Sequence, residues 1–101
     1  MNTITVEELK QRLDNGEKLH LLDVREDHER AEYNIGGVHI PVGKVQAMQV
    51  DEIENWKDDE IIVYCRSGNR SGMAAMFLQQ MGFKNPVNLT GGMLAWREKN
   101  G

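Results

Sequence analysis

Short apolar runs alternate with amphipathic stretches along the chain, and this alternation predicts an α/β fold. The run "IIVY" at residues 61–64 has no polar residue at alternate positions. It therefore predicts a central strand that is buried on both faces of a parallel sheet. Shorter β-favouring runs predict the remaining strands, at residues 3–6, 19–24, 38–42 and 87–89.

Helices are predicted between these strands. Thr5 and Glu8 form a capping-box pattern, which begins a helix that continues to Gly16. Further helical segments are expected at residues 26–33, within residues 44–60, and after the glycine pair at 91–92. In the second of these segments, Ile53 and Trp56 are three residues apart and could dock it on the core.

The segment after residue 70 predicts the longest helix. Methionine and other apolar side chains recur in it at helical spacing and predict the face that packs on the core. These residues are Met73, Met76, Phe77 and Met81, with Ala74, Ala75 and Leu78 widening the face. Gly82 is a natural residue to end the helix.

This order of elements predicts a sheet of mostly parallel strands with helices on both faces, because helical crossovers join parallel neighbours. A length of 101 residues and 40% hydrophobic content fit one compact domain over residues 1–101. In open α/β sheets, sites form at the carboxyl ends of the strands.

The composition argues against several classes of function. A net charge of −4 argues against a nucleic-acid partner, and no apolar stretch is long enough for a membrane span. The N-terminus lacks the features of a signal peptide. A single cysteine excludes an internal disulfide and a cysteine-based zinc site, and the three histidines lack metal-ligand spacing, so no metal is expected. The expected location is a reducing compartment, the cytoplasm.

The single cysteine, Cys65, falls where the central strand is predicted to end and a loop to Arg70 begins. Gly68 and Asn69 tolerate left-handed backbone angles, so this loop can turn its N–H groups inward. The N-terminus of the next helix, together with Arg66 and Arg70, adds positive charge. Each of these features favours a thiolate over a thiol.

A lone cysteine is often a buried structural residue, but the polar segment that follows Cys65 favours a nucleophile. Two chemistries suit such a site: phosphoryl transfer through a cysteinyl phosphate and sulfur transfer through a cysteine persulfide. Protein tyrosine phosphatases and their relatives place five residues between cysteine and arginine, whereas four separate Cys65 from Arg70. The smaller ring of amides is expected to suit one sulfur atom better than a tetrahedral phosphate.

Nearly the whole chain resembles the single-domain rhodaneses of the thiosulfate sulfurtransferase family. The resemblance lies in five segments in the family's order and spacing: "LLDVRE" (21–26), "IGGVHIPV" (35–42), "IIVYCRSGNRS" (61–71), "FLQQMGF" (77–83) and "VNLTGGMLAW" (87–96). It implies a three-layer α/β/α fold with a five-stranded parallel sheet in strand order 1-5-4-2-3. It also implies that Cys65 accepts the sulfur and that a loop cradles the persulfide. The residues of this loop are Arg66, Ser67, Gly68, Asn69 and Arg70.

The reaction implied by this resemblance has two halves that share one covalent intermediate. The Cys65 thiolate attacks the outer sulfur of thiosulfate or another sulfane donor, sulfite leaves, and a persulfide remains. An external acceptor then takes the sulfur, because the chain has no second cysteine. The acceptor can be cyanide, a small thiol or a thiol protein, and no metal or organic cofactor is needed.

Other polar residues near the predicted strand ends are expected to support the site. Asp23 could accept hydrogen bonds from backbone amides near the loop, and Arg25 could pair with Glu29 or another acid. Ser71 is expected to hydrogen-bond within the loop or to cap the helix.

Two roles are open for each of the two arginines in the loop. Arg70 could bind the substrate anion, which is the favoured role, or pair with a nearby acid and brace the loop. Arg66 could face an anionic donor or simply solvent.

Two other functions stay open beside sulfur transfer. One is a non-catalytic, rhodanese-like interaction module, although such modules often lack the cysteine. The other is a phosphatase or arsenate reductase on the same fold, which the short loop disfavours.

Overall fold

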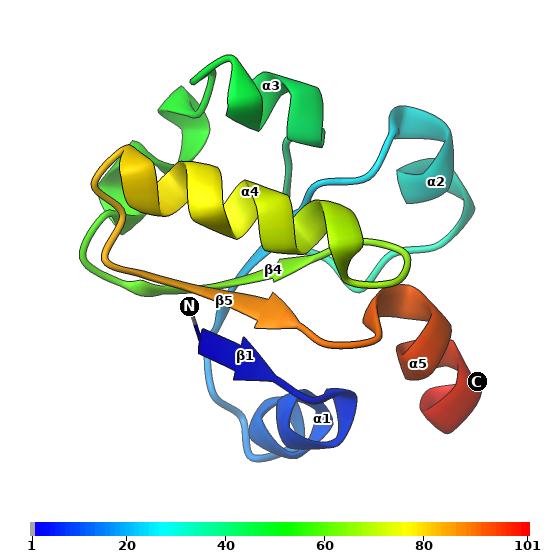
Figure 1. Ribbon diagram of the computed structural model, residues 1–101. Helices are drawn as coiled ribbons and strands as arrows, with labels where there is room; N and C mark the ends of the chain where they lie inside the picture. Colours follow the sequence, from blue (N-terminus) through cyan, green and yellow to red (C-terminus); the bar gives the residue numbers. More distant parts are fainter. Residues whose placement is uncertain (1) are drawn as a thin grey trace.

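A five-stranded parallel sheet forms the centre of the computed structural model, which describes residues 2–101 (Figure 1). The strands are β1 (Asn2–Ile4), β2 (His20–Asp23), β3 (Val38–His39), β4 (Glu60–Tyr64) and β5 (Asn85–Leu89). They lie in the order β1-β5-β4-β2-β3, and each neighbouring pair is parallel. The predicted α/β class and the strand order 1-5-4-2-3 are therefore confirmed.

Helices cover both faces of this sheet. They are α1 (Val6–Asp14), α2 (Asp27–Glu32), α3 (Val42–Gln46), the 3-10 helix η1 (Asp51–Trp56), α4 (Asn69–Gln80) and α5 (Gly92–Asn100). Helices α3 and α4 lie on one face and α1 and α5 on the other, with α2 beside the start of α4 (Figure 1). The capping box predicted for α1 is present, because Glu8 N donates to Thr5 Oγ1 and Thr5 N donates to Glu8 Oε1.

The central strand explains how one sheet supports two cores. Side chains alternate across a strand, so successive residues of β4 enter opposite layers. Ile61 and Val63 join the core under α3 and α4, whereas Ile62 and Tyr64 join the core under α1 and α5. All four are completely buried, which confirms a strand covered on both faces. Cys65 continues the alternation and faces the α4 layer.

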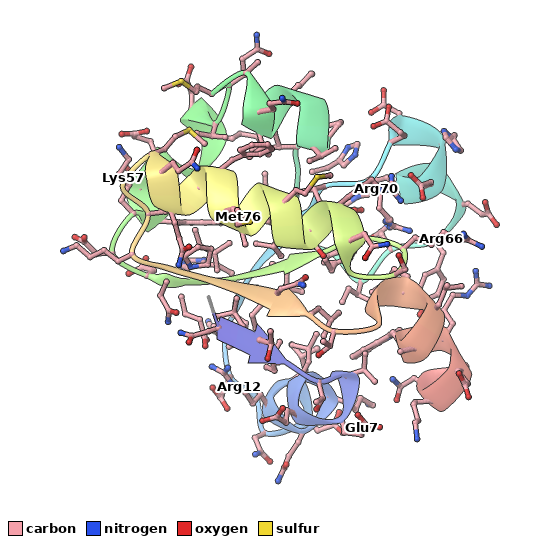
Figure 2. The ribbon with its side chains drawn as sticks, viewed as in Figure 1. Glu7, Arg12, Lys57, Arg66, Arg70 and Met76 are labelled. Carbon is pink, nitrogen blue, oxygen red and sulfur yellow. The ribbon has the colours of Figure 1, made fainter. Side chains whose placement is uncertain are left out.

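The core-facing side predicted for the longest helix is confirmed in part. Ala74, Ala75 and Leu78 pack on the sheet and are fully buried, and Phe77 and Met81 pack half-buried against the same core. Met73 and Met76 were predicted on this face but are 49% and 51% exposed, and Met76 lies on the open side of α4 in Figure 2. Small side chains let a helix approach a sheet closely, so the alanines form the centre of the inner face and these two methionines lie outside it.

Two boundaries also differ from the predictions. The strand predicted over residues 38–42 is only two residues long, because Pro41 lacks an N–H and instead precedes α3. Within residues 44–60 the chain forms α3 and η1, and η1 buries Ile53 while Trp56 packs half-buried against the same core. These turns therefore dock as expected.

Candidate active site

The thiol of Cys65 lies immediately after the central strand β4, at the carboxyl edge of the sheet. The residue is 1% exposed. Its sulfur accepts a hydrogen bond from the backbone N–H of Gly68 at 3.1 Å, and Ser71 Oγ lies 3.4 Å away with donor geometry. Polar donors therefore surround the sulfur on the side where the chain turns into α4.

The turn after Cys65 is shorter than the predicted loop over residues 65–70. Helix α4 begins at Asn69, so Arg70 already lies in its first turn. Gly68 is the N-cap residue and has φ +105°, a left-handed angle that favours glycine. The first N–H groups of a helix lack partners within that helix, and here the N–H groups of the N-cap Gly68 and of Ser71 act on the sulfur.

Burial raises the pKa of the Cys65 thiol, but the hydrogen bonds around it outweigh this effect. The opposing contributions come from the Ser71 side chain and from the backbone N–H groups of Ser71, Gly68 and Ser67. The pKa therefore lies below its ordinary value. Hydrogen bonds that favour the charged form lower a pKa in this way, so the site stabilises a sulfur anion chiefly with neutral donors.

Arg70 pairs with an acid, which was the less favoured of its two predicted roles. Its Nη1 and Nη2 donate to Glu29 Oε1 and Oε2 at 2.6 and 2.8 Å. The guanidinium of Arg70 holds the pKa of the Glu29 carboxyl at about 2. Helix α2 is thereby tied to the first turn of α4, and Figure 2 shows Arg70 lying against α2. Two-point pairing of this kind fixes orientation as well as adding energy.

Arg66 is exposed and lies between α2 and α5 (Figure 2). It forms no ion pair with any residue of the 2–101 region. A cavity of about 510 Å³ opens beside it. The cavity is lined by Arg25, His28, Glu29, Glu32, Tyr33, Arg66, Met93, Leu94 and Arg97. A ligand in this cavity would therefore meet an unpaired cation next to the Cys65 turn.

The start of α5 closes the other side of the turn. Met93 N and Leu94 N donate to the carbonyl groups of Cys65 and Arg66, both at 2.9 Å. Gly92 makes this approach possible, because a Cβ atom there would lie 2.4 Å from the Cys65 carbonyl oxygen. The glycine pair at 91–92 thus fixes the backbone of the site as well as leading into a helix.

Comparison with known proteins identifies the family. The rhodanese-like domain family matches residues 5–99. Among curated proteins, the chain is 43% identical over 97 residues to YrkF of Bacillus subtilis, and this alignment covers 95% of the chain and 51% of YrkF. A sulfurtransferase of Allochromatium vinosum is 37% identical over 97 residues, which cover 95% of the chain and 88% of that protein.

The chain belongs to the rhodanese-like domain family. It spans about half the length of YrkF. The crystal structure of a rhodanese-like domain protein from Staphylococcus aureus superimposes with a TM-score of 0.83 at 31% identity, covering 95% of this chain and 91% of that one. The resemblance stated from the five sequence segments is therefore confirmed for both family and fold.

In this rhodanese-like domain, Asp23 and Arg25 form a buried pair beside the site. Arg25 Nε and Nη2 donate to the two Asp23 carboxylate oxygens, both at 2.9 Å, and Arg30 lies 3.5 Å from one of them. Asp23 also accepts from the Arg25 N–H rather than from the amides of the Cys65 turn. Arg25 thus pairs with Asp23 rather than Glu29. A buried pair of this kind braces the carboxyl end of β2.

Two contacts that shape the site were not predicted from the sequence. Glu29 on α2 binds Arg70, and Asn88 on β5 bonds to both Gly68 and Ser71. Glu29 was expected only as a possible partner of Arg25. Nothing in the sequence marks Asn88, whose contacts depend on β5 lying next to β4.

The region from residue 2 to residue 101 offers no group of three or more His, Cys, Asp or Glu side chains arranged to hold a metal ion. Within the same region, no helix combines the length and apolar character that crossing a membrane requires.

Proposed function

We propose that residues 1–101 act as one rhodanese domain that transfers a sulfane sulfur through a persulfide on Cys65. The observation that carries the proposal is the position of the sulfur atom, which accepts from Gly68 N and lies beside Ser71 Oγ at the N-terminus of α4. These neutral donors stabilise a thiolate before the reaction and a persulfide anion after it. The family match and the sulfurtransferase name of the A. vinosum relative support the same assignment.

The first half-reaction forms the persulfide. The Cys65 thiolate attacks the outer sulfur of thiosulfate, a new S–S bond forms, and the S–S bond of thiosulfate breaks. Sulfite leaves with the electron pair of that bond, so no oxidant or proton is needed. Arg66 attracts the anionic donor, because its cation borders the cavity without a carboxylate partner in the described region. Residues 66–70 cradle the outer sulfur with their backbone amides.

The second half-reaction empties the site. An acceptor thiolate, or cyanide, attacks the outer sulfur of the persulfide, and the Cys65 thiolate leaves. The cavity of about 510 Å³ beside Arg66 is within the range of small-molecule sites; Cys65 does not line it, but Arg66 and Met93, which lie at the Cys65 turn, do. A small thiol or a thiol group on another protein is therefore the proposed physiological acceptor.

Arg70 serves this reaction as a brace rather than as a binder of the donor. Its Nη1 and Nη2 atoms already donate to Glu29, so this edge of the guanidinium is not available to an oxyanion. Asp23, Arg25 and Ser71 support the backbone around it. A reducing compartment, such as the cytoplasm, suits the activity, because a reactive single thiol would form mixed disulfides elsewhere.

Intact mass spectrometry after incubation with thiosulfate tests the proposal. The wild-type chain should gain one sulfur atom, and Cys65→Ser should gain none. Addition of cyanide or a small thiol should then remove the sulfur. If the wild type gains no sulfur and shows no turnover, the non-catalytic interaction module becomes the better assignment. Hydrolysis of an aryl phosphate that depends on Cys65 would instead favour a phosphatase.

A further inference from the structure

The side chain of Asn88 connects two residues of the Cys65 site from a neighbouring strand. Asn88 lies on β5, opposite Val63 of β4 in the parallel pairing. Its Nδ2 donates to the Gly68 carbonyl at 3.1 Å, and its Oδ1 accepts from Ser71 Oγ at 2.5 Å. Both hydrogen-bonding ends of one amide are therefore used on the turn that follows Cys65.

The same two residues supply the donors next to the sulfur. Gly68 N donates to Cys65 Sγ, and the Ser71 hydroxyl is the side-chain donor beside it. We propose that Asn88 is a positioning residue for the sulfur anion, because it anchors Gly68 through the carbonyl of that residue and sets the orientation of the Ser71 hydroxyl. The role of Asn88 in persulfide chemistry rests on the proposed function. Its effect on the pKa of the Cys65 thiol can be measured separately.

The single proton of the Ser71 hydroxyl is what couples Asn88 to the sulfur. A serine hydroxyl can donate one hydrogen bond at a time. The separation of 2.5 Å from Asn88 Oδ1 is short for an O–H···O bond, whereas 3.4 Å separates the hydroxyl from Cys65 Sγ. While Cys65 is a thiol, the Ser71 proton therefore lies toward Asn88. When Cys65 is a thiol, it can donate its own proton to Ser71 Oγ and complete a chain from thiol to hydroxyl to amide.

Loss of the thiol proton changes this series of hydrogen bonds. The thiolate then competes with Asn88 Oδ1 for the Ser71 proton, and the hydroxyl can serve the anion only by turning away from Asn88. Asn88 thus limits how much Ser71 stabilises the anion, while its Nδ2 keeps the Gly68 donor directed at the sulfur.

The amide of Asn88 lies against the start of α4. A Cβ atom placed on Gly72 would lie 3.4 Å from Asn88 Nδ2, and one on Gly68 would lie 4.0 Å away, both ordinary contact distances. The two hydrogen bonds to Gly68 and Ser71 therefore set the orientation of the amide.

A double-mutant cycle on the pKa of Cys65 tests this role. The thiolate is followed by its ultraviolet absorbance in the wild type, Ser71→Ala, Asn88→Ala and the double variant, with Cys65→Ser as the baseline. Ser71→Ala should raise the pKa in both backgrounds. The rise should be about one pH unit larger when residue 88 is alanine, because the Ser71 proton then has no competing acceptor. Equal shifts in the two backgrounds would overturn the proposal.

Asn88→Asp provides a second test that keeps the side-chain shape. The carboxylate still accepts from Ser71, so Ser71→Ala should change the pKa of Cys65 by the same amount as it does in the wild type. If Ser71→Ala raised the pKa of Cys65 as much in the Asn88→Asp background as in the Asn88→Ala background, residue 88 and the thiolate would not be competing for the Ser71 proton. Asn85→Ala is the matched control, because Asn85 lies on the same strand and bonds to Asn2 at its far end. It should leave the pKa of Cys65 unchanged.

None of these measurements requires sulfur transfer. A failed cycle would therefore leave the sulfurtransferase assignment standing, and a chain that gains no sulfur could still show the coupling. Persulfide formation from thiosulfate is the separate readout, and Asn88→Asp should slow it at least several-fold, because the carboxylate loses the bond to the Gly68 carbonyl and adds a negative charge near the anion.

Discussion

Replacement of Glu29 by glutamine tests how strongly helix α2 is tied to the Cys65 turn. Glutamine keeps the acceptor oxygen that Glu26 N uses at the start of α2, but it removes the charge that binds Arg70. The lowering of the Glu29 pKa from 4.5 to about 2 corresponds to about 3 kcal/mol of stabilisation at neutral pH. The side chains of Arg70 and Glu29 are 28% and 18% exposed, so solvent screens part of this energy. We expect a loss of about 2 kcal/mol in the free energy of unfolding at pH 7.

The pH dependence of this loss identifies its origin. The folded-state pKa of Glu29 is lowered, so the stabilisation is complete above pH 4.5 and is lost as the pH falls toward 2. Urea unfolding of the wild type and Glu29→Gln measures the difference in their free energies of unfolding. This difference should be similar at pH 7 and pH 5, and at pH 3 it should be less than half as large. Asp58→Asn is the control, because Asp58 pairs with Lys84 on the open surface and should contribute far less. The reasoning would be refuted if Glu29→Gln lost no more unfolding free energy at pH 7 than Asp58→Asn does. It would also be refuted if the full loss persisted at pH 3.

Three further changes have defined outcomes. Gly92→Ala should lower the free energy of unfolding by about 2 kcal/mol or more, measured by urea titration, because φ is +53° and the new Cβ would meet the Cys65 carbonyl oxygen. Gly43→Ala, where no atom lies within 4 Å of the new Cβ, should cause no such loss. Arg66→Gln should raise the KM for thiosulfate about threefold to tenfold, since it removes one unpaired charge, and an unchanged KM would exclude Arg66 from donor binding. Persulfide formation should lose rate as the pH falls through the lowered pKa of Cys65, and stopped-flow mixing with thiosulfate measures that midpoint; a rate that rises toward acid would contradict a thiolate nucleophile.

The sequence predicted the parts of this fold that a local pattern controls. Strand β4 could be predicted because every position from Ile61 to Tyr64 is apolar, which only a central strand explains well. The face of α4 could be predicted only in part, because the methionine and alanine stripes overlap at helical spacing and Met73 and Met76 were assigned to the inner face. Closeness of the helix to the sheet decides between the two stripes, and that distance is a tertiary property.

The same division holds for the candidate site. The arrangement of Cys65, Gly68 and Ser71 follows from one continuous segment, so its donors could be inferred from the residue types. The partner of Arg70 could not be inferred, because the chain has 16 acidic residues and only the fold brings Glu29 from α2 to the start of α4. Asn88 is hidden for the same reason, since its neighbours arrive through the pairing of β5 with β4.

The pairing of Arg70 also bears on which anion the site suits. A phosphoryl group carries nearly two negative charges at neutral pH, and phosphate sites commonly add charged arginine to backbone amides. In the first turn of α4, Arg70 has its charge balanced by Glu29, and the Cys65 sulfur lies beside Gly68 N and Ser71 Oγ. Neutral donors of this kind match a thiolate or a persulfide, which carry one charge each. The pairing of Arg70 with Glu29 therefore suits the single charge of the proposed persulfide, and it leaves the unpaired Arg66 as the cation available to a doubly charged donor.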